Sequence, residues 1–174
     1  MTGEIKEFIK SIAISIVAAF LIITFVFEGA IVDGFSMIPT LNDKDLLIVE
    51  KVTYYFRQPQ PGDIIVIHYP ANPKEKFVKR VVAVGGDKVK IENNKVYVNG
   101  QVRNENFTLE KWMNNFNEVT VPKGTLFLLG DNRNDSRDSR FPDVGFVDLK
   151  LVIGKATFRI YPLKNIGVLK SQKG

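Results

Sequence analysis

The 174-residue chain contains no cysteine and a single histidine, His68. Without thiols it can form no disulfide bond, no thiolate metal cluster and no cysteine nucleophile. One histidine cannot build a multi-histidine metal centre, so we expect neither a metal nor another cofactor. Acidic residues are outnumbered, because the chain has 19 aspartates and glutamates and 24 lysines and arginines, which gives a net charge of +5. Such an excess suits either nucleic acid or an anionic membrane surface as a partner.

A long uncharged run near the N-terminus favours the membrane. Residues 11–27 (SIAISIVAAFLIITFVF) carry no charge, and a segment that starts at Phe8 has twenty residues. As a helix it would span roughly 30 Å, about the thickness of the hydrocarbon core of a bilayer. A buried core helix would show a polar stripe, and a cleaved signal peptide would be followed by small residues where this chain has Glu28. We therefore interpret residues 1–29 as a short N-terminus and an uncleaved transmembrane anchor.

The distribution of lysines predicts the orientation of this anchor. Lys6 and Lys10 precede it, whereas only Lys44 follows it closely. The positive-inside rule then places the N-terminus in the cytoplasm and residues 30–174 on the extracytoplasmic side of the cell membrane. Those residues hold 22 basic and 16 acidic side chains, and an anionic bilayer explains this excess without nucleic acid.

Residues 30–174 have the pattern of an all-β domain of coiled antiparallel sheets. Short apolar stretches alternate with turn signals such as residues 61–63 (PGD), and no long amphipathic helix follows the anchor. Residues 107–117 are predicted to form a loop or a short helix, and residues 86–121 a small inserted lobe. The predicted strands are 45–51, 64–69, 77–84, 88–92, 95–98, 124–129 and 156–161.

Three of the six serines lie outside the anchor and the C-terminal tail: Ser36, Ser136 and Ser139. Ser36 lies in residues 34–40 (GFSMIPT), after a glycine and before a proline. Such a stretch can present a hydroxyl and a backbone N–H together at a fixed angle. Taken alone, the pattern favours an ordinary turn serine.

A lysine on an apolar strand face offers a base for Ser36. In an extended strand over 77–84, Lys79 lies among apolar neighbours on one face, and Arg80, a structural residue, lies on the other. Desolvation lowers the pKa of a lysine, and a neutral amine can take a proton from a serine hydroxyl. A lysine that reaches solvent from the strand end is the alternative, and the pattern leaves both open. For His68 we favour a polar residue near a strand end over a second candidate base.

The segment 130–140 (GDNRNDSRDSR) combines three aspartates, three arginines and two serines. Counted from Asp131, Ser136 stands where a calcium loop needs glycine and Pro142 where it needs glutamate, which excludes such a loop. Nucleic acid is also disfavoured, because the acids cancel the arginines. We interpret the segment as a hydrogen-bonded, ion-paired brace, in which Ser136 could also orient a catalytic amine.

Four motifs, in a fixed order, give the chain a resemblance to a known family. They are 36–41 (SMIPTL), 61–66 (PGDIIV), 79–87 (KRVVAVGGD) and 130–140. With the anchor, they resemble the bacterial type I signal peptidases, or leader peptidases, of the compact Gram-positive type. The resemblance implies a signal peptidase/LexA-like Ser-Lys protease fold and a membrane-bound endopeptidase that acts on the outer face of the membrane. Its partners would be signal-peptide-bearing preproteins and membrane lipid, and it would cut after Ala-x-Ala.

The same resemblance implies roles for individual residues. Ser36 would be the nucleophile and Lys79 the general base of a serine–lysine dyad. Ser136 would hydrogen-bond the lysine. Asp138 and Arg140 would form the ion pair that braces the site.

The resemblance also bears on the oxyanion hole and the substrate pockets. The backbone N–H of Ser36 would be one oxyanion donor. Gly34 stands where some members have a serine as the second donor, so its own N–H is the candidate here. The residues implied to line the substrate pockets are Val32, Met37, Leu47, Val66, Phe77 and Val78.

An extended substrate is expected to pair with residues 31–35 and 77–84, and so to present alternate side chains to the enzyme. Met37, Ile38 and Leu41 flank the nucleophile near the end of the anchor, and we expect them to rest against lipid.

Two other functions are alternatives on the residues alone. A LexA-like self-cleaving regulator shares Ser–Lys chemistry, but it carries a DNA-binding module where this chain has an anchor. A non-enzymatic, membrane-tethered β-domain would give Ser36 and Lys79 no reason to meet. A separation of their side chains above about 6 Å would favour that domain.

Overall fold

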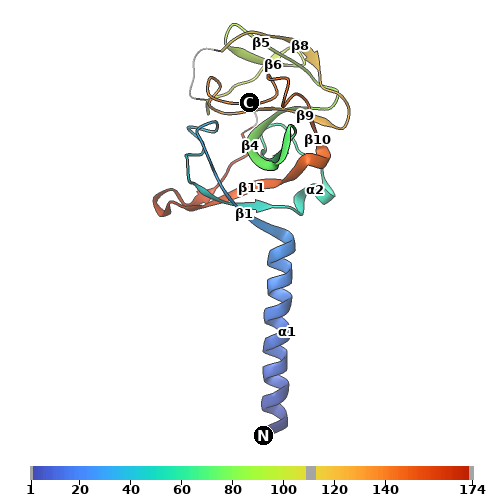
Figure 1. Cartoon of the computed structure of the whole chain (residues 1–174), viewed down its shortest axis with the longest axis vertical. Helices are drawn as coiled ribbons and strands as arrows, with labels where there is room; N and C mark the ends of the chain where they lie inside the picture. Colours follow the sequence, from blue (N-terminus) through green and yellow to red (C-terminus); the bar gives the residue numbers. More distant parts are fainter. Residues whose placement is uncertain (1, 109–112, 173–174) are drawn as a thin grey trace.

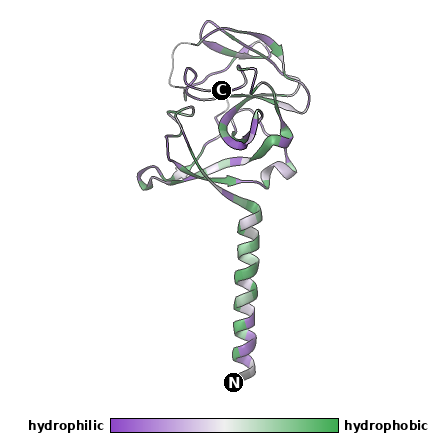
Figure 2. Cartoon of the chain, viewed as in Figure 1, coloured by the Kyte–Doolittle hydropathy of each residue, from purple (hydrophilic) through white to green (hydrophobic). Residues whose placement is uncertain are grey.

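The computed structural model describes residues 2–108 and 113–172. A long helix, α1 (Thr2–Val26), projects from a folded body built mainly of strands (Figure 1). Residues Gly3–Val26 have the length and composition of a membrane-spanning helix, and none of the apolar span is buried against the body. Apolar residues dominate the helix on the side of the body, and hydrophilic ones gather near its N-terminal end (Figure 2). An apolar helix that the described residues leave uncovered fits a lipid environment.

The main sheet of the body has eight strands in the described part of the chain, and its neighbouring strands are antiparallel. They are β1 (Phe27–Ile31), β2 (Leu46–Glu50), β3 (Ile64–Tyr69), β4 (Asn72–Val84), β9 (Thr125–Leu129), β10 (Val147–Asp148), β11 (Val152–Tyr161) and β12 (Gly167–Val168). Their order is β1-β2-β11-β3-β4-β9-β10, and β12 pairs with β11. Strand β4 therefore lies inside the sheet, with a partner on each side. The prediction of an all-β domain of antiparallel sheets is confirmed.

A second sheet lies at the end of the body farthest from α1 (Figure 1). Its strands are β5 (Lys88–Glu92), β6 (Lys95–Val98), β7 (Gln101–Val102) and β8 (Phe116–Thr120), in the order β7-β6-β5-β8. Asn93 and Asn94 have φ angles of 51° and 62°, as the two-residue turn of the β5–β6 hairpin requires. Val89 and Ile91 belong to the same buried cluster as Phe127 of β9, so one core joins the second sheet to the main one.

Only short helical turns follow α1 in the described residues. They are α2 (Thr53–Phe56), η1 (Leu149–Leu151) and η2 (Leu163–Asn165). Turn α2 follows β2, and η1 leads directly into β11. This agrees with the absence of a long amphipathic helix pattern after the anchor.

Most predicted strands are present, and the differences have physical reasons. Strands β3, β5 and β6 have the predicted bounds, whereas β4 begins at Asn72, five residues earlier than predicted. Its first part carries exposed charged residues and no apolar alternation, yet Lys76 still pairs with His68 of β3. Backbone pairing extended this strand where side-chain pattern gave no signal.

Strand β1 was not predicted, because it continues the apolar run of the anchor. Phe27 leaves the helix and pairs with Glu50 of β2, so residues 27–29, which the sequence analysis placed in the anchor section, belong to the main sheet. Strand β8 begins at Phe116, inside the stretch predicted as a loop or short helix. Residues 109–112 of that stretch lie outside the described residues.

Candidate active site

Ser36 lies in the loop that joins β1 to β2. The Val32 N–H donates to the carbonyl of Asp45 at 2.9 Å and closes the base of this loop. Met37 and Leu41 are 1% and 0% exposed and belong to a buried cluster beneath it. The prediction that these two side chains rest against lipid is therefore wrong, because they hold the loop to the core of the domain.

The side chains of Ser36 and Lys79 meet between this loop and strand β4. Lys79 Nζ lies 2.8 Å from Ser36 Oγ and 3.1 Å from the carbonyl oxygen of Val78. The lysine comes from inside the sheet, where it pairs with Ile65 of β3. The separation is a hydrogen-bond distance, far below the limit of about 6 Å above which a non-enzymatic domain would be favoured.

Lys79 is nearly sealed from solvent, with 3% of its surface exposed. Burial lowers the pKa of its ammonium from 10.5 to about 8, against the negative fields of Asp138 and Asp131, which raise the pKa. Both carboxylates are themselves engaged by arginines, Asp131 by Arg80 and Asp138 by Arg140. The amine is therefore partly neutral at mildly alkaline pH, and the neutral form is the one that accepts a proton.

The segment 130–140 holds the main chain of Ser36 in place. The Asn132 N–H donates to the carbonyl of Ser36 at 3.0 Å, and its side-chain amide donates to the carbonyl of Phe35 at 3.1 Å. Gly130 approaches so closely that a Cβ there would lie 2.4 Å from the Ser36 carbonyl oxygen. The sequence analysis did not single out Asn132, because a loop asparagine has no distinctive pattern.

Asp138 and Arg140 form a bidentate ion pair next to this contact. Nε and Nη2 of Arg140 each lie 2.8 Å from one oxygen of the Asp138 carboxylate, which is fully buried. The carboxylate also accepts from the Gly130 N–H at 3.1 Å, and Arg140 donates to the carbonyl of Arg133 at 2.6 Å. The pair thus ties the two ends of the segment together.

Ser136 forms no hydrogen bond with Lys79 in this structure. Its Oγ is buried and has no hydrogen-bond partner among residues 2–108 and 113–172, while the lysine amine contacts Ser36 and Val78. The hydroxyl lies 2.2 Å from the position that a Cβ at Gly130 would take. The orienting bond implied by the resemblance is therefore not formed here, because the hydroxyl faces Gly130 instead.

The Gly34 N–H is not free to bind an oxyanion. It donates to Oδ1 of Asp43 at 2.8 Å, across the loop. The proposed second oxyanion donor is therefore wrong, because a carboxylate already accepts this proton. The Ser36 N–H, by contrast, makes no hydrogen bond to the described residues.

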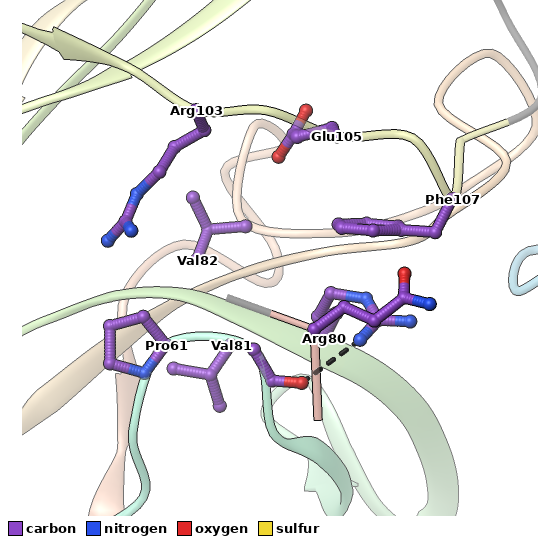
Figure 3. Close-up of a pocket in the computed structure, with 9 residues that line it drawn as sticks. Pro61, Arg80, Val81, Val82, Arg103, Glu105 and Phe107 are labelled. Atoms are coloured by element: carbon purple, nitrogen blue, oxygen red, sulfur yellow. Dashed lines mark hydrogen bonds between the residues drawn. The ribbon is translucent and has the colours of Figure 1, made fainter. Parts of the chain in front are cut away.

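Arg80 follows Lys79 in the chain and is buried on the opposite face of β4. Its guanidinium forms a bidentate pair with Asp131, at 2.8 Å and 2.6 Å, and donates to the carbonyl of Gly62 at 3.0 Å. Figure 3 shows the bond to Gly62 and the ring of Phe107, whose centre lies 4.1 Å from the guanidinium carbon. Arg80 thus links β4, the segment 130–140 and the chain that follows β7.

The stretch that carries Phe107 contacts the segment 130–140 a second time. Glu105 lies 2.6 Å from Nη1 of Arg133, whose buried side chain also donates to the carbonyl of Gly130 at 2.9 Å. The sequence analysis missed Glu105 and Phe107, because they lie outside every motif and every periodic stretch. Only the need of two buried arginines for partners could have drawn attention to them.

A cleft opens in front of the dyad, between residues 31–37 and 76–79. Leu47 and Val66 are 0% and 1% exposed and lie in the core rather than in its wall. Of the six predicted pocket residues, those that line the cleft are Val32, Met37, Phe77 and Val78. The charged residues that also line it are Asp33, Lys76, Asp135 and Arg137, and the last two belong to the segment 130–140.

His68 does not line this cleft. Its Nδ1 lies 2.7 Å from the carbonyl oxygen of Pro73, near the end of β3. This position suits the polar strand-end residue that the sequence analysis favoured. Within residues 2–108 and 113–172, no group of three His, Asp or Glu side chains is placed to hold a metal ion.

Comparison with known proteins gives the family. A protein-family model described as "Signal peptidase, peptidase S26" matches residues 5–161 of the chain. A probable signal peptidase I-1 of Synechocystis is 41% identical over 174 residues, which cover 96% of this chain and 88% of the relative. A signal peptidase I of Bacillus caldolyticus is 40% identical over 157 residues, which cover 80% of this chain and 82% of the relative.

Among solved structures, a signal peptidase I from Enterococcus faecalis matches with a TM-score of 0.52 and 31% identity, over 58% of this chain and 98% of that one. The antiparallel fold, the apolar helix and the paired Ser36 and Lys79 side chains are the features expected of a membrane-anchored serine peptidase. More narrowly, the chain belongs to the signal peptidase family, peptidase S26. The resemblance drawn from the four motifs is confirmed.

Proposed function

We propose that the protein removes N-terminal signal peptides from preproteins, with Ser36 as nucleophile and Lys79 as general base. The observation that carries the proposal is the 2.8 Å separation of Ser36 Oγ from the buried Nζ of Lys79. The family supplies the substrate class, because the relatives are named signal peptidase I.

The reaction proceeds through an acyl-enzyme. Neutral Lys79 Nζ accepts the Ser36 hydroxyl proton as Oγ bonds to the scissile carbonyl carbon, and the carbonyl electron pair moves to its oxygen. The Ser36 N–H stabilises that oxyanion. When the C–N bond breaks, the Lys79 ammonium gives its proton to the leaving amine, and an ester remains on Ser36. Water then passes a proton to Lys79 and attacks the ester, and the ammonium reprotonates Oγ as the carboxylate product leaves.

The buried brace positions the dyad. The Asp138 carboxylate, paired with Arg140, accepts from the Gly130 N–H, and Gly130 packs against the Ser36 carbonyl, so the ion pair supports the main chain that carries the Ser36 hydroxyl. The Ser136 hydroxyl is a buried polar group without a hydrogen-bond partner in the part of the chain that the structure describes, an arrangement that is unfavourable by about 1–3 kcal/mol. The family resemblance, rather than a contact in this structure, supports a role of Ser136 in orienting the lysine amine during turnover.

Cleavage is proposed to follow Ala-x-Ala. An extended substrate laid between residues 31–35 and 77–79 points its first and third side chains before the cut into the same wall. Val32, Phe77 and Val78 line the cleft, and we expect these apolar side chains to accept alanine and to disfavour large or charged groups by overlap and desolvation. A preprotein series with Leu or Lys at the residue before the bond should resist cleavage, and efficient cutting of either would contradict this pocket.

We further propose that residues 1–29 hold the cytoplasmic N-terminus and the anchor, whose helix ends at Val26, and that residues 30–174 form an extracytoplasmic catalytic domain with 86–121 as an inserted lobe. The support is the placement of Lys6 and Lys10 before the span. Protease added outside intact protoplasts should digest the catalytic domain. Protection of that domain would reverse the topology.

The direct test of the activity is incubation of the full chain in detergent micelles with a labelled preprotein, followed by N-terminal sequencing of the product. We expect a new N-terminus after the Ala-x-Ala sequence, at a rate that a metal chelator leaves unchanged. The Ser36→Ala variant is the matched control, and a product from it at the wild-type rate would refute the proposal.

A further inference from the structure

A hollow of about 260 Å³ lies between α2 and η1, apart from the catalytic cleft. Its lining includes Lys51, Tyr54, Tyr55, Gln58, Lys150 and Ile153. None of these residues contributes to the dyad or to its brace. The proposed function therefore gives this hollow no role.

Main-chain pairing places the hollow beside the end of the membrane anchor. Glu50, the residue before Lys51, pairs with Phe27 of β1 and with Lys155 of β11. The Lys51 N–H donates to the carbonyl of Val26 at 2.9 Å, and its ammonium donates to the carbonyl of Thr24 at 3.2 Å. Figure 1 likewise shows α2 next to the body end of α1. If α1 spans the bilayer, as the inference requires, the hollow lies at the membrane surface.

The lining carries two lysines and no carboxylate. The Lys51 ammonium lies 3.8 Å from Glu28, but that carboxylate makes its close contact, at 2.5 Å, with Lys76. For the exposed Lys150, no carboxylate lies within ion-pair distance of the ammonium among the described residues. Asp148 accepts from its backbone N–H instead, at 2.8 Å. Glu28 thus partly compensates the charge of Lys51, whereas the charge of Lys150 has no carboxylate partner in the described part of the chain.

Aromatic side chains extend outward from the same turn. Tyr55 and Phe56 of α2 are 80% and 85% exposed. Aromatic residues at this level of a membrane protein favour the headgroup layer, where lysines also meet anionic lipids. A free phosphate ion would satisfy the two lysines but would leave both rings in water, so a lipid fits the whole surface better.

We propose that the hollow binds the phosphate of an anionic phospholipid headgroup through Lys51 and Lys150, with Tyr55 and Phe56 in the interfacial layer. The β1–β2 ladder runs from Phe27 and Glu50 beside the hollow to Ile31 and Leu46 beside the cleft. A lipid bound at one end of this ladder, together with α1, orients the cleft at its other end relative to the bilayer.

Thermal unfolding of the full chain in uncharged micelles tests the site. A ligand that binds only the folded state raises the Tm, so short-chain phosphatidylglycerol should raise it and short-chain phosphatidylcholine should not. Lys150→Gln should weaken the apparent affinity for phosphatidylglycerol about fivefold, because one lysine near an anionic surface contributes that much. The matched control is Lys95→Gln on the distant β5–β6 hairpin, which removes the same charge and should behave as wild type.

Three results would overturn the proposal. If phosphatidylglycerol raised the Tm of wild type and of Lys150→Gln equally, Lys150 would not bind the lipid and the proposed site would be refuted. An equal weakening in Lys95→Gln would reduce it to general charge attraction. A shift by inorganic phosphate as large as that by phosphatidylglycerol, and lost in Lys150→Gln, would make the site one for free phosphate. Because the measurement is binding, it stands even if the protein fails to cleave preproteins.

Discussion

The two faces of strand β4 carry buried cations in neighbouring positions. Lys79 and Arg80 are 3% and 1% exposed, so burial is nearly equal. Arg80 meets the Asp131 carboxylate in a bidentate pair. Among the described residues, the hydrogen-bond partners of Lys79 are uncharged oxygens, those of Ser36 and Val78, and its amine also lies 5.0 Å from the centre of the Phe77 ring.

The difference shows that the partner, rather than burial, decides what a buried cation does. Arginine stays protonated at any working pH, and with a carboxylate it can hold loops together in the interior. A lysine without a carboxylate partner responds to desolvation by a lower pKa, and it becomes a base. Under the proposed mechanism, Arg80 therefore has a structural role and the neighbouring Lys79 a chemical one.

The largest effect on the rate of cleavage is expected from removing the Lys79 amine. Lys79→Met should lower preprotein cleavage by about 10⁴-fold or more, because a triad-type base and its nucleophile act as a unit. Ser36→Ala should lower it to the same residual level. Cleavage rates with circular dichroism as the folding control will check this, and substantial activity in Lys79→Met would end the mechanism.

On the other face, Asp131→Asn should lower the free energy of unfolding by about 3–5 kcal/mol, because it leaves the Arg80 charge buried without its partner. The change also removes a field that raises the pKa of Lys79, so the rising limb of the pH–rate profile should move to lower pH. Urea unfolding and pH–rate profiles measure the two effects. Asp135→Asn, an exposed carboxylate of the same segment, is the control, and equal stability of both variants would contradict the pairing argument.

The stability of wild type relative to Lys79→Met should depend on pH. The folded-state pKa of about 8 lies below the unfolded value of 10.5, so the unfolded chain binds more protons between these values. Burial of the charged amine therefore lowers the free energy of unfolding of the wild type, by its full amount below pH 8. This destabilisation disappears as the pH rises toward 10.5. The shift corresponds to about 3 kcal/mol at most. Unfolding measured at pH 6 and pH 10 should show the advantage of Lys79→Met shrinking, and a constant difference would contradict a lowered pKa.

A smaller effect is expected at the ring that covers Arg80. Phe107→Leu should reduce the free energy of unfolding by about 1–2 kcal/mol, through lost cation–π attraction and packing. The rising limb of the pH–rate profile should not move, because the Phe107 ring lies on the face of β4 that carries Arg80 rather than Lys79. Chemical unfolding checks the first claim, and Phe56→Leu at an exposed aromatic position is the control. A shift of the rising limb of the pH–rate profile in Phe107→Leu would show that the two faces of β4 are not independent.

The sequence predicted the parts of the molecule that local pattern encodes. Apolar runs located β3, the β5–β6 hairpin and the span of α1, and alternation placed Lys79 and Arg80 on opposite faces. It missed β1, because Phe27 continues an apolar run and only its pairing with Glu50 shows that the helix has ended.

The parts of the site that failed depend on contacts between distant segments. The Gly34 N–H was a sensible oxyanion donor until Asp43, nine residues later, was found to accept its proton. Glu105 and Phe107 lie in a polar stretch without period, and their role arises only because buried arginines face them. Contacts of this kind depend on the tertiary structure, and the spacing of residues in the sequence does not predict them.

The pKa of the Lys79 amine tests the central claim most directly. NMR titration of the full chain in micelles, with lysine labelled at Cε and Lys79→Met used to assign the signal, would measure it without reliance on turnover. We predict a midpoint of about 8 for Lys79, separate from the other lysines. A midpoint at the ordinary lysine value of 10.5 would mean that the buried amine is charged at working pH, and would contradict its role as the base.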